Sequence, residues 1–455
     1  MTIRLTDSRP ARLPLTGADC FLRAFDAEIG RWNGASHVSG LVLRLGPGFD
    51  VEIFRKLLDD VAREQPILGA PIRRRFGLGL PEYRLDPGRD GPPPVSVHDV
   101  DAPRAAGAPL PAIFSRRLNE RRSLRRGELI RFDVVRYAGG AGGTELAMTW
   151  MHLLLDGAGS ERFVQWLDEV HRGAVGASDL PDPDELRGDA PSSRSLAERG
   201  DAARRWKAWV DGFAEPPLRS LAGPRRRVPQ DLRFDVLHLN RDETERAVAQ
   251  AGRRAGFLTP MLFYLAAAIR AHHAVFEARG VDPGAYLVPL PVNLRPRGRE
   301  GAIFRTHVSL IWFHVDPAVV GDFDALIDEL KAQRRAAIKA GHVENGVAAM
   351  EFVRSAPARL YARMARSGTK GELCSFFFAY TGEFLPGIER FLGAEIHDGF
   401  HVAPVPPSPG SCMAMSIHRG RLNLTHVFQR SVVADDERRR MRDSLRRDLL
   451  SEAGR

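Results

Sequence analysis

The spacing of hydrophobic and polar residues along the chain alternates several times between that of a strand and that of a helix. Residues 37–46, HVSGLVLRLG, have the apolar, β-branched composition of a strand. Residues 49–66, FDVEIFRKLLDDVAREQP, place apolar side chains at helical spacing, and Pro66 marks the helix end. A strand followed by a helix predicts the first α/β unit of the chain.

Two further apolar segments predict a hairpin. Residues 129–137, LIRFDVVRY, and 144–155, TELAMTWMHLLL, are separated by the glycine-rich AGGAGG at 138–143. This hairpin puts His152 near the far end of a strand, with Asp156 and Gly157 in the turn after it. SERFVQWLDEVH, with Ser160 and Glu161 in the first turn, then predicts a helix.

The pattern predicts three parts in the whole chain. Residues 1–175 form a first lobe, 176–230 a crossover linker, and 231–455 a second lobe with the same α/β organisation. The linker is rich in Pro, Gly, Ser and charge, with a short helix around Trp206 and Trp209. The second lobe is predicted to contain strands at 233–240, 285–294, 306–315 and 373–382, a hairpin at 411–428, and helices at 241–256, 259–276 and 435–450.

Length and composition fit two lobes. A chain of 455 residues is too long for one compact core, and its 44% hydrophobic and 27% charged residues can fill and cover two. No apolar run is long enough to cross a bilayer, and the first residues lack the apolar region of an export signal. Three cysteines form no CxxC pair. We therefore expect a cytoplasmic protein, and a monomer.

The formal net charge of +9 does not by itself predict nucleic-acid binding. Only five of the 66 basic residues are lysines, and the arginines are scattered. No helix-turn-helix, zinc or RNP pattern accompanies them. A basic surface would also suit an anionic cofactor or an acidic carrier protein.

One short motif carries candidate chemistry. His152 precedes the pair Asp156 and Gly157 by four residues. A histidine at a strand end can project into a cleft, and its pKa near working pH suits a general base. We expect Gly157 to allow close backbone approach or a positive φ. The structural alternative is a core histidine bonded to a backbone carbonyl. His272 and His273, adjacent on a helix, point in different directions and do not predict a metal site.

The segment MHLLLDG resembles the HHxxxDG motif of the chloramphenicol-acetyltransferase-like superfamily, which includes peptide condensation domains and acyl-CoA-dependent acyltransferases. Met151 stands at the first motif position, which is mostly supportive in relatives. Residues 289–301, PLPVNLRPRGREG, resemble the arginine-bearing PVxLRP stretch of that superfamily. Less specific likenesses occur in the expected order, at RLPLTGADCFL, VAREQPILGAPI, TPMLFYLAAAIRAH and FFFAYTGEF.

The resemblance implies an α/β, two-lobed chloramphenicol-acetyltransferase-like fold: a pseudo-dimer of mixed β-sheets covered by helices, with an active-site tunnel between the lobes. It implies that His152 is the base and that Asp156 pairs with an arginine, for which Arg295 is our first choice and Arg297 the second. Tyr380 and Thr381 are candidate hydroxyls of the substrate tunnel, and packing at a strand end is the alternative role for each.

The implied function is acyl transfer from a thioester, acyl-CoA or acyl carrier protein, to a hydroxyl or amine of a small molecule in secondary-metabolite or lipid biosynthesis. No permanently bound cofactor and no metal is expected. One alternative is a stand-alone condensation enzyme that forms peptide or amide bonds. Another is a condensation-like module that has lost catalysis and serves for docking; the presence of His152 favours an enzyme.

Overall fold

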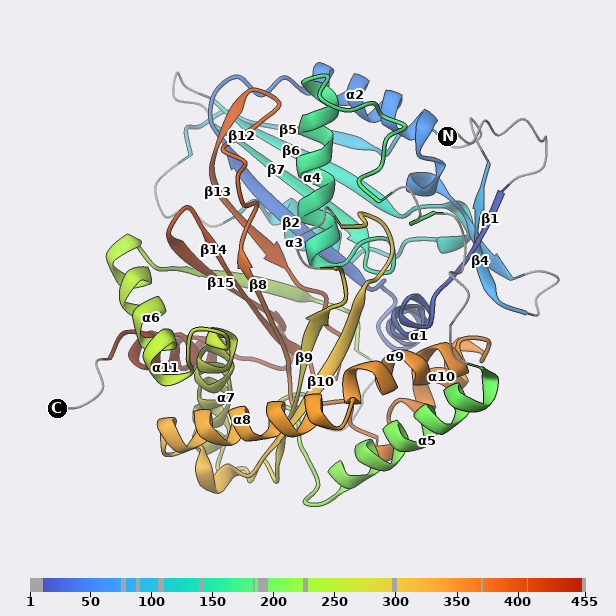
Figure 1. Ribbon diagram of the computed structural model, residues 1–455. Coiled ribbons are helices and arrows are strands. Elements are labelled where there is room, and N and C mark those ends of the chain that lie inside the picture. The colour runs from blue at the N-terminus through green and yellow to red at the C-terminus, as the bar shows by residue number, and fades with distance from the viewer. Residues whose placement is uncertain are drawn as a thin grey trace.

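The protein is described by a computed structural model in which strands occupy the centre and helices surround them (Figure 1). The second-choice partner Arg297 lies outside the described residues. These residues are 11–74, 79–86, 91–104, 110–138, 143–182, 185–186, 195–223, 228–296, 301–369, 371–406 and 408–451.

Six strands form the upper sheet in Figure 1, in the order β12-β13-β2-β7-β6-β5. Neighbouring strands are antiparallel except β5 and β6, which are parallel. Helix α4 lies across this sheet (Figure 1). The elements of this region are β2 (Val38–Leu45), α2 (Val51–Glu64), β5 (Val95–Val100), α3 (Ala112–Leu118), β6 (Ile130–Tyr137), β7 (Thr144–Met151), α4 (Gly157–His171), β12 (Arg390–Phe391) and β13 (Ala394–Val402).

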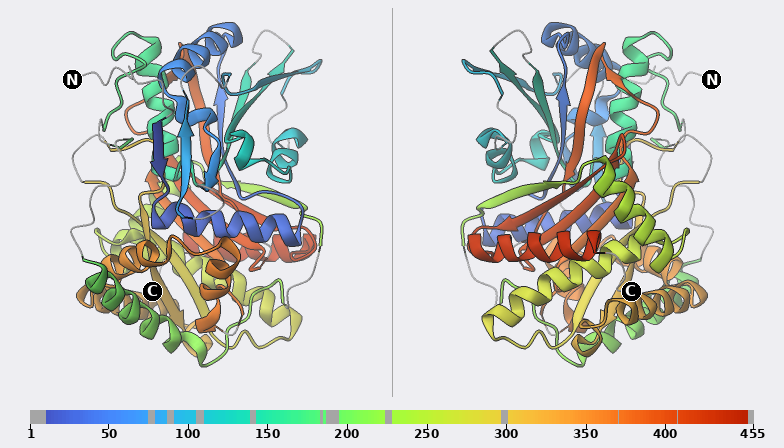
Figure 2. Two further views of the ribbon diagram at one scale, coloured as in Figure 1. Left: turned by 90° about the vertical axis from the view of Figure 1, so that its right-hand side faces the viewer. Right: turned by 90° about the vertical axis from the view of Figure 1, so that its left-hand side faces the viewer.

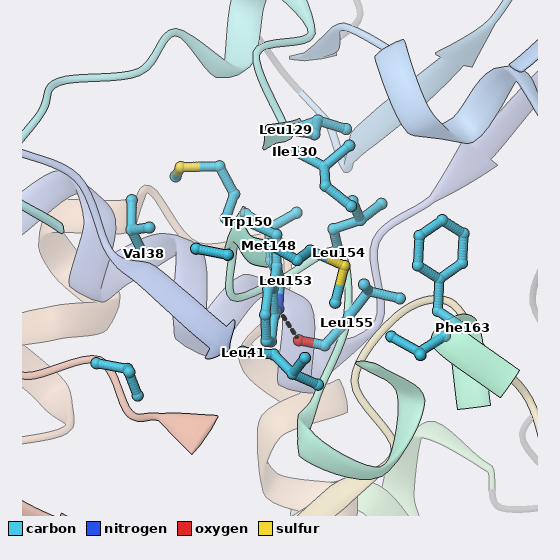
Figure 3. Close-up of a cluster of buried hydrophobic side chains, with 14 of the residues drawn as sticks. Val38, Leu41, Leu129, Ile130, Met148, Trp150, Leu153, Leu154, Leu155 and Phe163 are labelled. Carbon is cyan, nitrogen blue, oxygen red and sulfur yellow. Dashed lines mark hydrogen bonds between the residues drawn. The ribbon is translucent and has the colours of Figure 1, made fainter. Parts of the chain in front are cut away.

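Strand β7 is the centre of the upper sheet. All eight of its residues are buried, because β2 and β6 pair with it on both sides and the layers above and below cover its faces. Figure 3 shows the side chains that gather around its end, among them Leu41 from β2, Ile130 from β6 and Phe163 from α4. The strand that carries the motif is thus held on every side, which fixes the position of the residues after it.

The lower half contains a four-stranded sheet and a separate strand pair. The order of the sheet is β11-β14-β15-β8, and β9 pairs with β10. A further sheet of three strands, in the order β1-β4-β3, lies beside the upper half (Figure 1). These elements are β1 (Ala11–Pro14), β3 (Ile72–Arg74), β4 (Pro81–Leu85), β8 (Leu232–His238), β9 (Tyr286–Asn293), β10 (Val308–Val315), β11 (Phe377–Glu383), β14 (Ser411–His418) and β15 (Arg421–Gln429).

Helices cover the lower sheet and fill the space beside it. Helix α7 is apolar on nearly all sides and buried, as its sequence predicted, and the amphipathic α11 packs against it. The helices of this half, with one that precedes the upper sheet, are α1 (Gly17–Trp32), α5 (Leu196–Asp211), α6 (Arg241–Arg254), α7 (Pro260–Arg279), α8 (Phe323–Lys339), α9 (His342–Val353), α10 (Ala358–Met364) and α11 (Asp435–Leu450).

The two halves of the sequence exchange elements in the structure. Strand β13 belongs to the second half of the sequence but pairs with β2 of the first, with Val402 opposite Gly40, and Figure 1 shows the two strands side by side. Helix α1 belongs to the first half but packs against α9 and α10 of the second (Figure 2). A local pattern predicts a strand or a helix but does not say which sheet it joins.

The structure also differs from the sequence-based expectations at three local points. Helix α1 was not predicted, although Thr16 and Asp19 form a capping box at its start. Helix α4 begins at Gly157, three residues before the predicted start, because Asp156 is its N-cap. The helix expected around Trp206 and Trp209 is α5, which spans 16 residues. Within the described residues, no helix is long and apolar enough to cross a membrane.

Candidate active site

A cavity of about 510 Å³ lies between the two halves of the molecule. Its walls come from both: α1, the start of β2 and the end of β7 on one side, and β9, β10, β11 and β14 on the other, with the end of β13 crossing between them. Apolar side chains such as Phe25, Leu310 and Phe377 dominate the wall, and His152 opens onto the same space. The motif histidine therefore faces a largely apolar cavity at the junction of the halves.

The backbone and ring of His152 are both held in place. Its backbone N–H donates to the carbonyl of His37 at 3.1 Å. Its ring Nδ1 lies 3.2 Å from the carbonyl oxygen of Leu155, and since a carbonyl only accepts, Nδ1 must carry the proton. The other ring nitrogen, Nε2, then keeps its lone pair. Burial lowers the pKa of His152, so the ring is neutral near pH 7 and able to accept a proton.

The turn after His152 is fixed by contacts that the sequence did not reveal. The indole N–H of Trp150 donates to the Leu155 carbonyl at 2.8 Å, the dashed line in Figure 3. The hydroxyl of Tyr83 donates to the Leu153 carbonyl at 3.1 Å, and the backbone N–H of Arg305 donates to the Leu154 carbonyl at 2.6 Å. All three leucines are buried. The carbonyl that orients the imidazole is therefore itself immobilised.

Asp156 and Arg295 form the ion pair that the resemblance implied. Arg295 Nη1 donates to Asp156 Oδ2 at 2.8 Å, and both side chains are buried. The backbone N–H of His307 donates to the same oxygen, and that of Gly159 donates to Oδ1, each at 2.8 Å. Burial alone would raise the pKa of Asp156, but Arg295 and these two donors hold it below its usual range. The carboxylate is thus ionised and fully engaged in linking the two halves.

The structural requirement for glycine lies at Gly159, which corrects the prediction made for Gly157. The φ angle of Gly157 is not in the left-handed region, and a Cβ there would meet only Thr381 Cγ2, at an ordinary 3.7 Å. A Cβ on Gly159 would lie 2.3 Å from the carbonyl oxygen of Ile303 and 3.0 Å from Arg295 Nη2. The start of α4 lies close to Ile303 of the second half at that position. The motif spacing did not predict this contact.

The candidate tunnel residues both line the cavity from β11. The Tyr380 ring stacks on Tyr264 of α7, with 4.9 Å between the ring centroids, and is half-buried. Thr381 is exposed and lies beside Gly157. Neither hydroxyl forms a hydrogen bond with the described residues. Tyr380 therefore has a packing role as well as a place on the cavity wall.

Met151 is completely buried and does not line the cavity. Consecutive residues at the end of a strand point to opposite faces, so Met151 points into the core of the upper sheet when His152 points into the cavity. An apolar side chain at the first motif position suits that environment.

His37, Glu161 and His401 are further ionisable side chains that line the cavity, and the sequence indicated no role in the site for them. Ser160 Oγ donates to the Gly157 carbonyl at 2.7 Å, so at 3.1 Å it accepts from His401 Nε2. Glu161 Oε2 accepts from the backbone N–H of Leu385 at 2.8 Å. Burial raises the pKa of Glu161 to about 8 and lowers that of His401 to about 4. No motif connects these residues, because they come from three separate elements.

The adjacent histidines of α7 are engaged separately. His272 Nε2 contacts Ser411 Oγ at 3.0 Å, and His273 Nδ1 contacts the Tyr286 hydroxyl at 2.8 Å. In the part of the chain that the structure describes, no three His, Cys, Asp or Glu side chains gather as a metal site would require.

Comparison with known proteins places this geometry in a known architecture. No family model and no curated protein matches the sequence. Among solved structures, a trichothecene 15-O-acetyltransferase from Fusarium sporotrichioides is 14% identical, with a TM-score of 0.69 over 97% of this chain and 95% of that chain. The condensation domain of the monacolin K polyketide synthase MokA is 17% identical, with a TM-score of 0.64 over 97% of each chain.

A third structure, polyketide synthase associated protein 5 from Mycobacterium tuberculosis, is 16% identical, with a TM-score of 0.60 over 99% of this chain and all of that chain. The protein has the condensation-domain fold. This confirms the predicted two-lobed, chloramphenicol-acetyltransferase-like architecture. His152 lines the cavity between the two halves of this fold.

We expect the two glycines of the motif region to respond differently to alanine. Gly159→Ala should lower the free energy of unfolding by about 1 to 3 kcal/mol, since its Cβ overlaps the Ile303 carbonyl. Gly157→Ala should change it by less than about 1 kcal/mol, because alanine is a better helix former and has room. Urea denaturation of both variants checks this, and equal losses would contradict the assignment.

Removal of the Arg295 guanidinium should be strongly destabilising. Arg295→Met leaves the Asp156 carboxylate buried without its cation, and we expect a loss of about 3 to 5 kcal/mol in the free energy of unfolding. The double variant Asp156→Asn, Arg295→Met should recover part of that loss. The matched control is Arg136→Met, whose pair with Asp99 is exposed and should cost less than about 1 kcal/mol. Similar losses of unfolding free energy in Arg295→Met and Arg136→Met would contradict this expectation.

The buried carboxyl of Glu161 should make stability depend on pH. Its pKa of about 8 in the folded protein exceeds the ordinary 4.5, so between these values the folded state keeps a proton that the unfolded chain has lost. The free energy of unfolding of the wild type should therefore fall as pH rises from 4.5 to 8, because deprotonation favours the unfolded chain. Relative to wild type, Glu161→Gln should gain stability over this range, with a limit on the order of 5 kcal/mol.

Denaturation of wild type and Glu161→Gln at pH 5 and pH 8 measures this difference. The control is Glu64→Gln, at an exposed position near the end of α2, which should give the same difference from wild type at both pH values. A Glu161→Gln difference that is also independent of pH would contradict the buried, neutral carboxyl.

Proposed function

We propose that the protein is an acyltransferase that moves an acyl group from a thioester to a hydroxyl or amine acceptor. The observation that carries the proposal is the state of His152. Its Nδ1 proton is committed to the Leu155 carbonyl, burial keeps the ring neutral, and the ring opens onto a cavity between the halves. A neutral imidazole whose Nε2 keeps its lone pair is the group that removes a proton from an attacking hydroxyl or amine.

In the proposed reaction, the acceptor transfers its proton to His152 Nε2 as its oxygen or nitrogen attacks the thioester carbonyl carbon. The carbonyl π electrons move to oxygen, which becomes an oxyanion in a tetrahedral intermediate. The oxyanion collapses, the C–S bond breaks, and the departing thiolate takes the proton back from the imidazolium. The Leu155 carbonyl accepts from Nδ1–H throughout and stabilises the transient positive charge.

The cavity supports a substrate that is largely apolar. Phe21, Phe25, Leu310 and Phe377 line it, and such side chains can surround an acyl chain and exclude water. The donor would be acyl-CoA or an acylated carrier protein, and both are anionic. The basic net charge of +9 favours the approach of either and does not distinguish them.

The runner-up is amide-bond formation by a stand-alone condensation enzyme, which would use the same base and a carrier-bound amine. The condensation-domain fold is compatible with it. A non-catalytic docking module is less well supported, because the geometry that prepares His152 as a base would then have no use. The acceptor and the product distinguish these alternatives, and the following experiment determines both.

Replacement of His152 should abolish transfer. Purified wild type and His152→Ala are incubated with acetyl-, hexanoyl- and palmitoyl-thioesters of CoA and of a carrier protein, in the presence of a small-molecule extract, and products are identified by mass spectrometry. We expect His152→Ala to lower the rate by about a hundredfold or more. The control His171→Ala removes an exposed histidine at the end of α4 and should be fully active. Equal rates in wild type and His152→Ala would reject the proposed function.

A further inference from the structure

A second imidazole lies beside His152 at the junction of the halves. His37 immediately precedes β2, and Val38 of that strand pairs with Met151 of β7, so the register sets His37 next to His152. The ring centroids are 5.5 Å apart and the ring planes meet at 60°. Both rings line the same cavity. This neighbour belongs to a different strand from the motif, and no sequence pattern marked it.

The His37 ring is almost completely buried. Only 4% of the residue is exposed, and the edge of the Phe25 ring packs against it with 5.5 Å between centroids. Its backbone N–H donates to Asp26 Oδ1 at 3.2 Å, and its backbone carbonyl accepts from His152. The charge of Asp26 is shared with Arg121, at 3.1 Å. Among the residues that the structure describes, the His37 side chain has no ion-pair partner.

One nitrogen of this ring is enclosed by protein and unused. His37 Nδ1 is buried and has no hydrogen-bond partner among the described residues. Burial and the nearby His152 hold the pKa of His37 well below its usual range, so the ring is neutral. A neutral imidazole has one N–H, and at Nδ1 that donor would be buried without an acceptor. The proton therefore resides on Nε2, the nitrogen that can reach a partner in the cavity.

We propose that His37 is a second catalytic residue, a neutral donor whose Nε2–H binds the carbonyl oxygen of the thioester while His152 takes the proton of the acceptor. This inference rests on the proposed function and deepens it. His37 transfers no proton; it stabilises negative charge as that charge forms on oxygen. A neutral donor in a largely apolar site performs this task without the desolvation cost of a charged group.

The spacing of the two rings fits this division of roles. In the tetrahedral intermediate, the oxyanion and the attacking atom are bonded to the same carbon and lie about 2 to 2.5 Å apart. Each needs a ring nitrogen at about 2.8 Å. Two imidazoles with centroids 5.5 Å apart can contact both atoms from one side of the cavity. Because Met151 points into the core, the first motif position cannot supply this second ring.

The tautomer of His37 is measured without any substrate. Protein labelled with ¹⁵N-histidine is examined by long-range ¹H–¹⁵N correlation NMR at pH 7, and the His37→Gln variant assigns the signal. We expect a neutral ring with the proton on Nε2. A ring protonated on Nδ1, or a charged ring, would overturn the proposal even if the protein proves to be an acyltransferase.

Three replacements of His37 test the role in turnover. His37→Phe keeps the ring shape without nitrogen, His37→Gln puts an amide donor near the place of Nε2, and His37→Asn puts one near that of Nδ1. On the thioester that wild type uses best, we expect His37→Phe and His37→Asn to lower kcat by about a hundredfold with little change in KM, and His37→Gln to lie within about tenfold of wild type.

The outcomes separate this inference from the proposed function. If His152→Ala is inactive and His37→Phe is fully active, the proposed function stands and the role of His37 is overturned. If the three variants lose activity in proportion to their loss of thermal stability, His37 has only a packing role and the proposal is again overturned. If His152→Ala is as active as wild type, the proposed function fails, and the turnover role of His37 fails with it.

Discussion

The interaction on which the site depends is the buried ion pair between Asp156 and Arg295. It joins the turn after His152 to the end of β9, so it ties the motif to the opposite half of the molecule. Two backbone donors, from Gly159 and His307, complete the shell of the carboxylate. A buried pair adds little net stability, because desolvation of two charges offsets their attraction. Its contribution here is positional, because it connects the turn after His152 with the segment that follows β9.

Several ionisable side chains line the cavity beside this pair. Around the cavity, burial lowers the pKa values of His37, His152 and His401 and raises that of Glu161. Each of these side chains is neutral near pH 7. The buried charges of Asp156 and Arg295 beside them balance each other. An apolar cavity with neutral donors and acceptors is suited to a reaction in which charge appears only on the path to products.

Most elements and half of the site were predictable from the sequence, because both depend on local signals. Apolar periodicity predicted strands such as β7 and helices such as α7. The motif spacing indicated His152 and Asp156 as candidate site residues. The exchange of β13 into the first sheet was not predictable, since strand pairing is decided by contacts between distant segments. For the same reason Gly159, not Gly157, is the glycine that packing requires: the atom it approaches belongs to residue 303.

The departure from the motif at Met151 has a geometric explanation. A strand end presents consecutive side chains to opposite faces, so only one residue of the pair 151 and 152 can reach the cavity. The other residue, Met151, lies in the core. A methionine needs no hydrogen-bond partner there, whereas a buried imidazole would need partners for its two nitrogens. A second ring beside His152 must therefore come from the neighbouring strand. In this chain the antiparallel register of β2 with β7 places His37 at that point, where its backbone carbonyl already holds the His152 amide.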